Sequence, residues 1–109
     1  MGTLGVVAEA SDVTVRDDPP ENSYELLVDG ERVGRLHYLP TRGALVLVHT
    51  EVAPQLEGKG LGGQLVAGAL EDIGARGLRL IPVCPFVTSY VERHPEYADL
   101  VARERAPPK

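Results

Sequence analysis

The sequence is poor in cysteine and has no long apolar run. Cys84 is the only cysteine among 109 residues, so no disulfide can form within the chain and no cysteine cluster can hold a metal. This cysteine usage is typical of a reducing, intracellular compartment, and we expect a cytoplasmic protein. No apolar run is long enough to cross a membrane, and the N-terminus lacks the basic start and apolar core of a signal peptide. We therefore expect neither a membrane partner nor a metal.

Positive charge is also scarce. The chain has 11 Lys and Arg against 16 Asp and Glu, a formal net charge of -5. Nucleic-acid binding needs clustered Lys and Arg, so we expect no nucleic-acid partner. The acidic balance is compatible with a cationic substrate such as an amine. The length and the 43% hydrophobic content are typical of one folded domain over 1–109, with a core at about 13–101 and flexible tails at 1–10 and 103–109.

The N-terminal half has the alternation of apolar and polar residues that is typical of strands. Asp29-Gly30 favours a hairpin turn, because both residue types accept positive φ. The residues 17–22 and 40–43 have turn composition. The pattern predicts three antiparallel strands at Val13–Arg16, Tyr24–Val28 and Arg32–Tyr38.

The C-terminal half has the pattern of a parallel βαβ unit. Ala44–Thr50 is apolar on both faces, as in a central strand, and Leu61–Arg76 has one apolar helical stripe. The next strand is predicted at Leu78–Val83, parallel to the first. Helical segments follow at Pro85–Arg93 and Pro95–Ala102. The fold class is therefore α/β, a mixed sheet with antiparallel N-terminal strands and a parallel βαβ pair.

Three glycines at alternate positions separate the central strand from its helix. Glycine lets backbone N–H groups contact a ligand, and a helix start supplies unpaired N–H groups and a positive dipole end. Such a turn favours a phosphate or pyrophosphate. The alternative is a glycine-rich turn that binds nothing. The segment reads Glu57-Gly58-Lys59-Gly60-Leu61-Gly62.

Two reactive residue types end neighbouring predicted strands. His49 ends the central strand and Cys84 ends the next one, so both are expected to face one cleft at the carboxyl edge of the sheet. His49 suits a general base; the alternative is a histidine bonded to backbone groups. Cys84 begins a helix, which favours a partly accessible, reactive thiolate; the alternative is a small buried hydrophobe.

Two further side chains have weaker signals. Lys59 suits phosphate neutralisation, but no Ser or Thr follows it, so the turn is not a P-loop. It is equally typical of a solvated turn residue. Tyr90 suits protonation of a leaving thiolate, but a tyrosine four residues from Phe86 on one helix is more often a core residue.

Four segments in this order resemble the small single-domain branch of the GNAT acyltransferase superfamily. The likeness runs from about residue 13 to residue 101. The superfamily signature is Arg or Gln, two residues, Gly, one residue, then Gly or Ala. Here Gly60 and Gly62 hold the glycine positions, while Glu57 replaces Arg or Gln; a frame from Gln55 matches literally but starts the helix too early. The segments are Val48–Val52, Glu57–Gly62, Ile81–Phe86 and Arg93–Tyr97.

The resemblance implies a minimal GNAT-like acyl-CoA N-acyltransferase fold and acetyl transfer from acetyl-CoA to a small or peptidyl amine. It makes His49 and Cys84 candidate catalytic residues. Direct attack of the amine and a two-step route through acetylated Cys84 both remain open, with backbone N–H near Val52 polarising the thioester. Larger members carry a proton-donating Tyr where Val91 stands here, so the donor is also open. The implied acetyl-CoA contacts are Val52, Glu57, Gly58, Lys59, Gly60, Leu61, Gly62, Cys84, Pro85 and Tyr90.

Two other functions are compatible with the sequence. A non-catalytic CoA-binding module needs the glycine turn but neither His49 nor Cys84. A protein-interaction domain needs no ligand at the turn. The sequence does not identify the acceptor, and we expect a monomer or a weak dimer.

Overall fold

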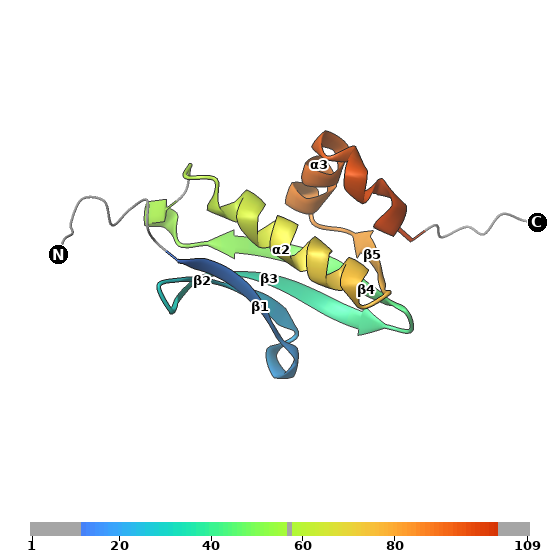
Figure 1. Cartoon of the computed structure of the whole chain (residues 1–109), viewed down its shortest axis with the longest axis horizontal. Coiled ribbons are helices and arrows are strands. Elements are labelled where there is room, and N and C mark those ends of the chain that lie inside the picture. The colour runs from blue at the N-terminus through green and yellow to red at the C-terminus, as the bar shows by residue number, and fades with distance from the viewer. Residues whose placement is uncertain (1–11, 57, 103–109) are drawn as a thin grey trace, which may run out of the picture.

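A computed structural model describes residues 12–56 and 58–102. The predicted tails and Glu57 lie outside the described residues. Five strands form one sheet in chain order (Figure 1), antiparallel from β1 to β4 and parallel between β4 and β5. The predicted mixed sheet with a parallel pair at its end is confirmed. The strands are β1 (Val13–Asp18), β2 (Ser23–Val28), β3 (Glu31–Thr41), β4 (Ala44–Val52) and β5 (Arg79–Pro82).

The two α-helices lie on the same face of the sheet (Figure 1). In the described part of the chain the opposite face carries no helix, and we call it the bare face. Three short 3-10 helices complete the fold, the last of them in the region where a final helical piece is predicted. No helix among the described residues is long and apolar enough to span a membrane. The helices are η1 (Pro19–Glu21), η2 (Pro54–Leu56), α2 (Leu61–Ala75), α3 (Pro85–Arg93) and η3 (Pro95–Leu100).

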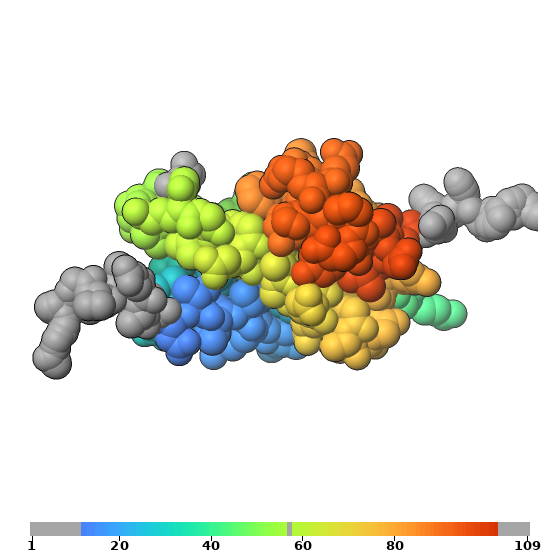
Figure 2. Space-filling model, turned by 45° about the horizontal axis from the view of Figure 1, so that its top comes forward, coloured from blue at the N-terminus to red at the C-terminus, as the bar shows by residue number. Residues whose placement is uncertain are grey.

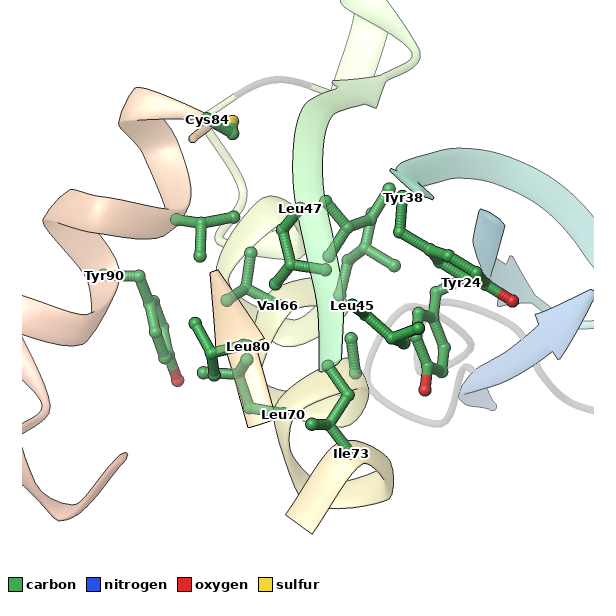
Figure 3. Packing of buried hydrophobic residues seen from close by; sticks show 14 of the residues in the cluster. Tyr24, Tyr38, Leu45, Leu47, Val66, Leu70, Ile73, Leu80, Cys84 and Tyr90 are labelled. Atoms are coloured by element: carbon green, nitrogen blue, oxygen red, sulfur yellow. The ribbon is translucent and has the colours of Figure 1, made fainter. Parts of the chain in front are cut away.

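The core lies between α2, α3 and the sheet (Figure 3). The predicted apolar stripe of α2 is the face that packs, because residues four apart on a helix lie on one side. Alternate residues of the central strands pack against this stripe, because their side chains share one face of the sheet. The fully buried members include Leu65, Val66, Leu70 and Ile73 of α2, and Leu26, Leu36, Leu47 and Leu80 of the sheet.

The central strand β4 carries one extra residue relative to β3. Tyr38 pairs with Leu47, but the preceding residue His37 pairs with His49, so Val48 has no partner across the ladder. A bulge of this kind reverses the alternation of faces along the rest of the strand.

The reversal decides which side chains of β4 face the helices. Thr50 pairs with buried Leu36 and therefore shares the helix face with it. His49 and Glu51 point to the bare face. At the end of β4, Thr50 therefore faces the helices, whereas His49 and Glu51 lie on the bare face.

The parallel strands β4 and β5 separate next to the bulge at Val48. β5 pairs with β4 only as far as Leu47, whose carbonyl accepts hydrogen bonds from Val83 N–H at 3.0 Å and Cys84 N–H at 2.9 Å. The chain then turns into α3, where Pro85 at the first helical position needs no N–H partner. Within the described ranges, no strand continues beside β4 past this point on the side of β5, whereas β3 stays paired with β4 as far as Val52.

Candidate functional site

A cleft of about 460 Å³ opens where β4 and β5 separate. The end of β4, the start of α2 and the start of α3 enclose it. Figure 2 shows the yellow-green surface around the start of α2 beside the orange surface of α3. Its lining residues are Thr50, Val52, Leu56, Gly58, Gly60, Leu61, Gly62, Gly63 and Phe86.

The glycine turn forms one side of this cleft. Gly58 and Gly60 have φ of +84° and +76°, the left-handed region that favours glycine. An added Cβ at either position would have no described atom within 4 Å. These glycines therefore set the backbone conformation and leave open space toward the cleft.

The start of α2 faces the same cleft. Gly60 is its N-cap, and no side chain of the described residues caps it. The first intrahelical bond runs from Gln64 N–H to Gly60 O at 3.2 Å, so the N–H groups of 61–63 have no partner within the helix. With the positive end of the helix dipole, they suit a bound anion.

Phe86 forms the wall that α3 contributes. Its side chain is 43% exposed and lies against the first turn of α2. A Cβ on Gly62 would lie 2.9 Å from Phe86 Cζ, so a larger residue there would displace the Phe86 ring from this position. Phe86 therefore gives the cleft an apolar wall beside the first turn of α2.

The free edge of β4 supplies backbone groups. Ala53 N–H donates to Val33 O on β3 at 2.8 Å. Since N–H groups alternate between the two edges of a strand, those of Thr50 and Val52 point away from β3, toward the cleft. A ligand in the cleft can pair with the Val52 N–H as a neighbouring strand would, whereas the Thr50 N–H is hydrogen-bonded to the Cys84 thiol.

Cys84 lies behind Thr50 at the N-cap of α3. Its Sγ is 3.4 Å from Thr50 Oγ1, and the residue is 4% exposed. The predicted partial accessibility is therefore wrong, because α3 and β4 close over the sulfur. Burial raises the pKa of the thiol, but hydrogen bonds from the Thr50 hydroxyl and from N–H groups of Val87, Phe86 and Thr50 outweigh it, and the pKa is lowered.

His49 lies on the bare face, 59% exposed, with Nε2 3.2 Å from Glu51 Oε2. His37 Nε2 is 3.9 Å from the same oxygen, and the two imidazole rings are stacked with centroids 6.2 Å apart. The expectation that His49 and Cys84 share one cleft mouth is wrong, because the bulge at Val48 moves His49 to the other face. Thr50 takes the place beside the thiol, and no feature of the apolar run marks that change.

The remaining predicted contacts fall into two groups. Val52, Gly58, Gly60, Leu61 and Gly62 line the cleft. Lys59 and Pro85 are exposed and lie outside the lining; Glu57 is outside the described residues.

Tyr90 belongs to the packing between α3 and α2. It is 9% exposed, stacks on His94 with ring centroids 4.1 Å apart, and its ring lies 3.6 Å from a Cβ built on Gly63. Figure 3 shows its hydroxyl directed away from Cys84. Burial, with the charge of Glu96, raises the pKa of Tyr90. The geometry does not bring this phenol to the cleft.

A second cleft, of about 320 Å³, lies at the paired ends of β3 and β4, where Arg35 and Glu51 reach it from the bare face; we call it the bare-face cleft. Sequence reasoning missed it, because its walls come from β3 and β4 residues that only the register brings together. Val52 lines both clefts, so the end of β4 separates them. The lining is Arg32, Val33, Gly34, Arg35, Glu51, Val52, Ala53 and Pro54.

The hydrogen bonds to Cys84 have a measurable consequence. Iodoacetamide is expected to alkylate Cys84 slowly, because the sulfur is buried, but with a pH midpoint below that of free cysteine. Thr50→Val, which keeps the side-chain shape and removes the hydroxyl, should raise that midpoint, whereas Thr50→Ser should retain it. Labelling only on unfolding, or an unchanged midpoint in Thr50→Val, would contradict the inferred role of Thr50.

Comparison with known proteins gives one family and many similar folds. Residues 23–100 match the family model described as GCN5-related N-acetyl-transferase. A GCN5-like protein from Staphylococcus aureus superposes with a TM-score of 0.61 at 20% identity, over 84% of this chain and 89% of that one. The ribosomal-protein-S18-alanine N-acetyltransferase from Escherichia coli gives a TM-score of 0.56 at 17% identity, over 66% of this chain.

The match to the Escherichia coli enzyme is partial, because the chain spans 50% of that chain. At such identities the solved structures show a common fold, and the family model shows the family. No curated protein sequence matches the chain.

Proposed function

Because the chain belongs to the GCN5-related N-acetyltransferase family, we propose that it transfers the acetyl group of acetyl-CoA to a small or peptidyl amine. The thioester C–S bond breaks, an amide C–N bond forms, the amine loses a proton, and CoA leaves as a thiol. The observation that carries the proposal is the cleft at the separation of β4 and β5. It combines an anion-binding helix start with free backbone groups of a strand.

The cleft fits acetyl-CoA by chemistry as well as by position. The open space at Gly58 and Gly60, beside the first N–H groups of α2, suits the pyrophosphate. The carbonyl groups of Thr50 and Val52, which also point away from β3, suit the amide N–H groups of the pantetheine arm. Val52 N–H is the group we assign to polarise the thioester carbonyl, since a fixed donor stabilises charge that develops on the oxygen.

Proton removal from the amine is assigned to His49 on the bare face. Glu51, 3.2 Å from its Nε2, orients the ring and stabilises the imidazolium that forms. The amine then approaches from the face of β4 opposite to acetyl-CoA. Direct transfer requires no movement of the buried thiol, so we favour it over a route through acetylated Cys84.

A turnover assay tests the proposal. The protein is mixed with acetyl-CoA and a panel of amines, and free CoA thiol and acetylated amine are measured together. Equal amounts of both products support acetyl transfer. Binding of acetyl-CoA in calorimetry without turnover of any amine would instead indicate a non-catalytic module, and no binding would indicate an interaction domain.

The same mixture distinguishes the two chemical routes. With acetyl-CoA alone, direct transfer predicts no acetyl group on Cys84 in the intact-protein mass spectrum. Acetylated Cys84 that disappears when an amine is added would establish the two-step route.

A further inference from the structure

The bare-face cleft carries charge of both signs beside the proposed base. Arg32 and Arg35 reach it from β3, and Glu51 reaches it from β4. Glu51 is also the carboxylate nearest His49. A molecule in this cleft therefore meets the cationic groups of Arg32 and Arg35 and the carboxylate of Glu51, and His49 lies next to that carboxylate, outside the lining.

Arg35 is the cation in this cleft that has no counterion among the described residues. Its cross-strand neighbour Glu25 is engaged by Arg16 at 3.0 Å and Arg32 at 3.5 Å. Across the described ranges, Arg35 makes neither an ion pair nor a side-chain hydrogen bond. Its side chain is nevertheless half-buried. A partly buried guanidinium is stabilised by an anionic partner, which a bound molecule can supply as two parallel hydrogen bonds.

The register fixes how far this cation lies from the base. Arg35 pairs with Glu51, and the next pair on the same face is His37 with His49. Successive residues on one face of a strand are roughly 7 Å apart. An anionic group on Arg35 and an amine at His49 thus suit a single small molecule.

We propose that the acceptor is an amino-carboxylate, whose carboxylate binds Arg35 in the bare-face cleft while its amine lies at His49 and Glu51. The inference rests on the proposed function, because it names the acceptor class of the same site. It gives Arg35 a role in acceptor binding and none in acetyl-CoA binding, since Arg35 does not line the cleft between β4 and β5.

A matched pair of acceptors tests the proposal by turnover. γ-Aminobutyrate and butylamine have the same carbon chain and differ only in the carboxylate. At saturating acetyl-CoA, we expect kcat/KM to be about 10- to 100-fold higher for γ-aminobutyrate, as for loss of a charged hydrogen bond. Arg35→Gln should remove this preference by slowing γ-aminobutyrate alone. Equal kcat/KM for both amines in the wild type, or equal losses for both in Arg35→Gln, would overturn the inference.

Arg42→Gln is the control variant. Arg42 is an exposed residue at the β3–β4 turn, at the other end of the same hairpin. The substitution makes the same change in net charge, so we expect it to keep the preference. Loss of the preference in both variants would trace it to overall charge and overturn the assignment to Arg35.

A binding experiment separates this inference from the proposed function. In an NMR titration of the ¹⁵N-labelled wild type with γ-aminobutyrate and no acetyl-CoA, we expect backbone shifts at Arg35, Glu51 and Val52. No shifts at these residues would overturn the inference, even if other amines are acetylated. Shifts there without turnover of any amine would support an amino-carboxylate site at Arg35 and contradict the proposed function.

Discussion

Replacing His49 with glutamine is expected to lower kcat by about 10²–10⁴-fold, the usual contribution of a general base. Glutamine keeps the size and some hydrogen bonding of histidine but cannot take up the proton of the amine. The affinity for acetyl-CoA should change little, because His49 points to the bare face, whereas Thr50, which lines the cleft between β4 and β5, points to the helix face. The measurement is turnover with a saturating amine over a range of pH, in which the variant should differ from the wild type in the profile as well as in the rate.

His37→Gln is the matched control for that experiment. His37 lies on the same face and next to His49, but its Nε2 is 3.9 Å from the Glu51 carboxylate rather than 3.2 Å. We expect a much smaller loss of kcat. Wild-type turnover and an unchanged pH profile in His49→Gln would show that His49 is structural. Equal losses of kcat in both variants would instead indicate that His37 and His49 act together in accepting the proton of the amine.

Replacing Gly60 with valine is expected to weaken acetyl-CoA binding by about 10- to 100-fold, the size of a lost charged hydrogen bond. The new side chain fills the open space beside the first N–H groups of α2, where the pyrophosphate is proposed to bind. The variant also holds a β-branched residue at φ +76°, which strains the backbone. Calorimetric titration with acetyl-CoA measures the affinity, and thermal unfolding measures the strain.

Gly43→Val separates strain from ligand binding. Gly43 has φ of +78°, and a Cβ there also has no described atom within 4 Å. It precedes β4 at the end of the strand far from the cleft. We expect a similar loss of stability but unchanged affinity for acetyl-CoA. A folded Gly60→Val protein with wild-type affinity would refute the assignment of the pyrophosphate to this turn.

The helix bounds that the sequence predicts correctly are marked by residues close to them in the chain. α3 has the predicted bounds, Pro85–Arg93, because proline favours the first position and a second proline, Pro95, follows its end. The start of α2 at Leu61 was predicted because the glycines before it break the strand pattern. Both signals lie within a few residues of the feature that they mark.

The features that the sequence could not predict depend on pairing between distant residues. The bulge at Val48 lies in a run that is apolar on both faces, so alternation gives no sign that His49 changes face. The Thr50 contact with Cys84 depends on the same bulge. That Arg35 has no ion-pair partner in the described part of the chain depends on which arginines reach Glu25 across the sheet.

The position of acetyl-CoA is the claim on which the account depends most. An NMR titration of the ¹⁵N-labelled protein with acetyl-CoA tests it residue by residue. We expect the largest backbone shifts at Thr50, Val52, Gly60, Gly63 and Phe86, which surround the cleft between β4 and β5. Shifts confined to the bare face, or no saturable shifts at all, would contradict the account.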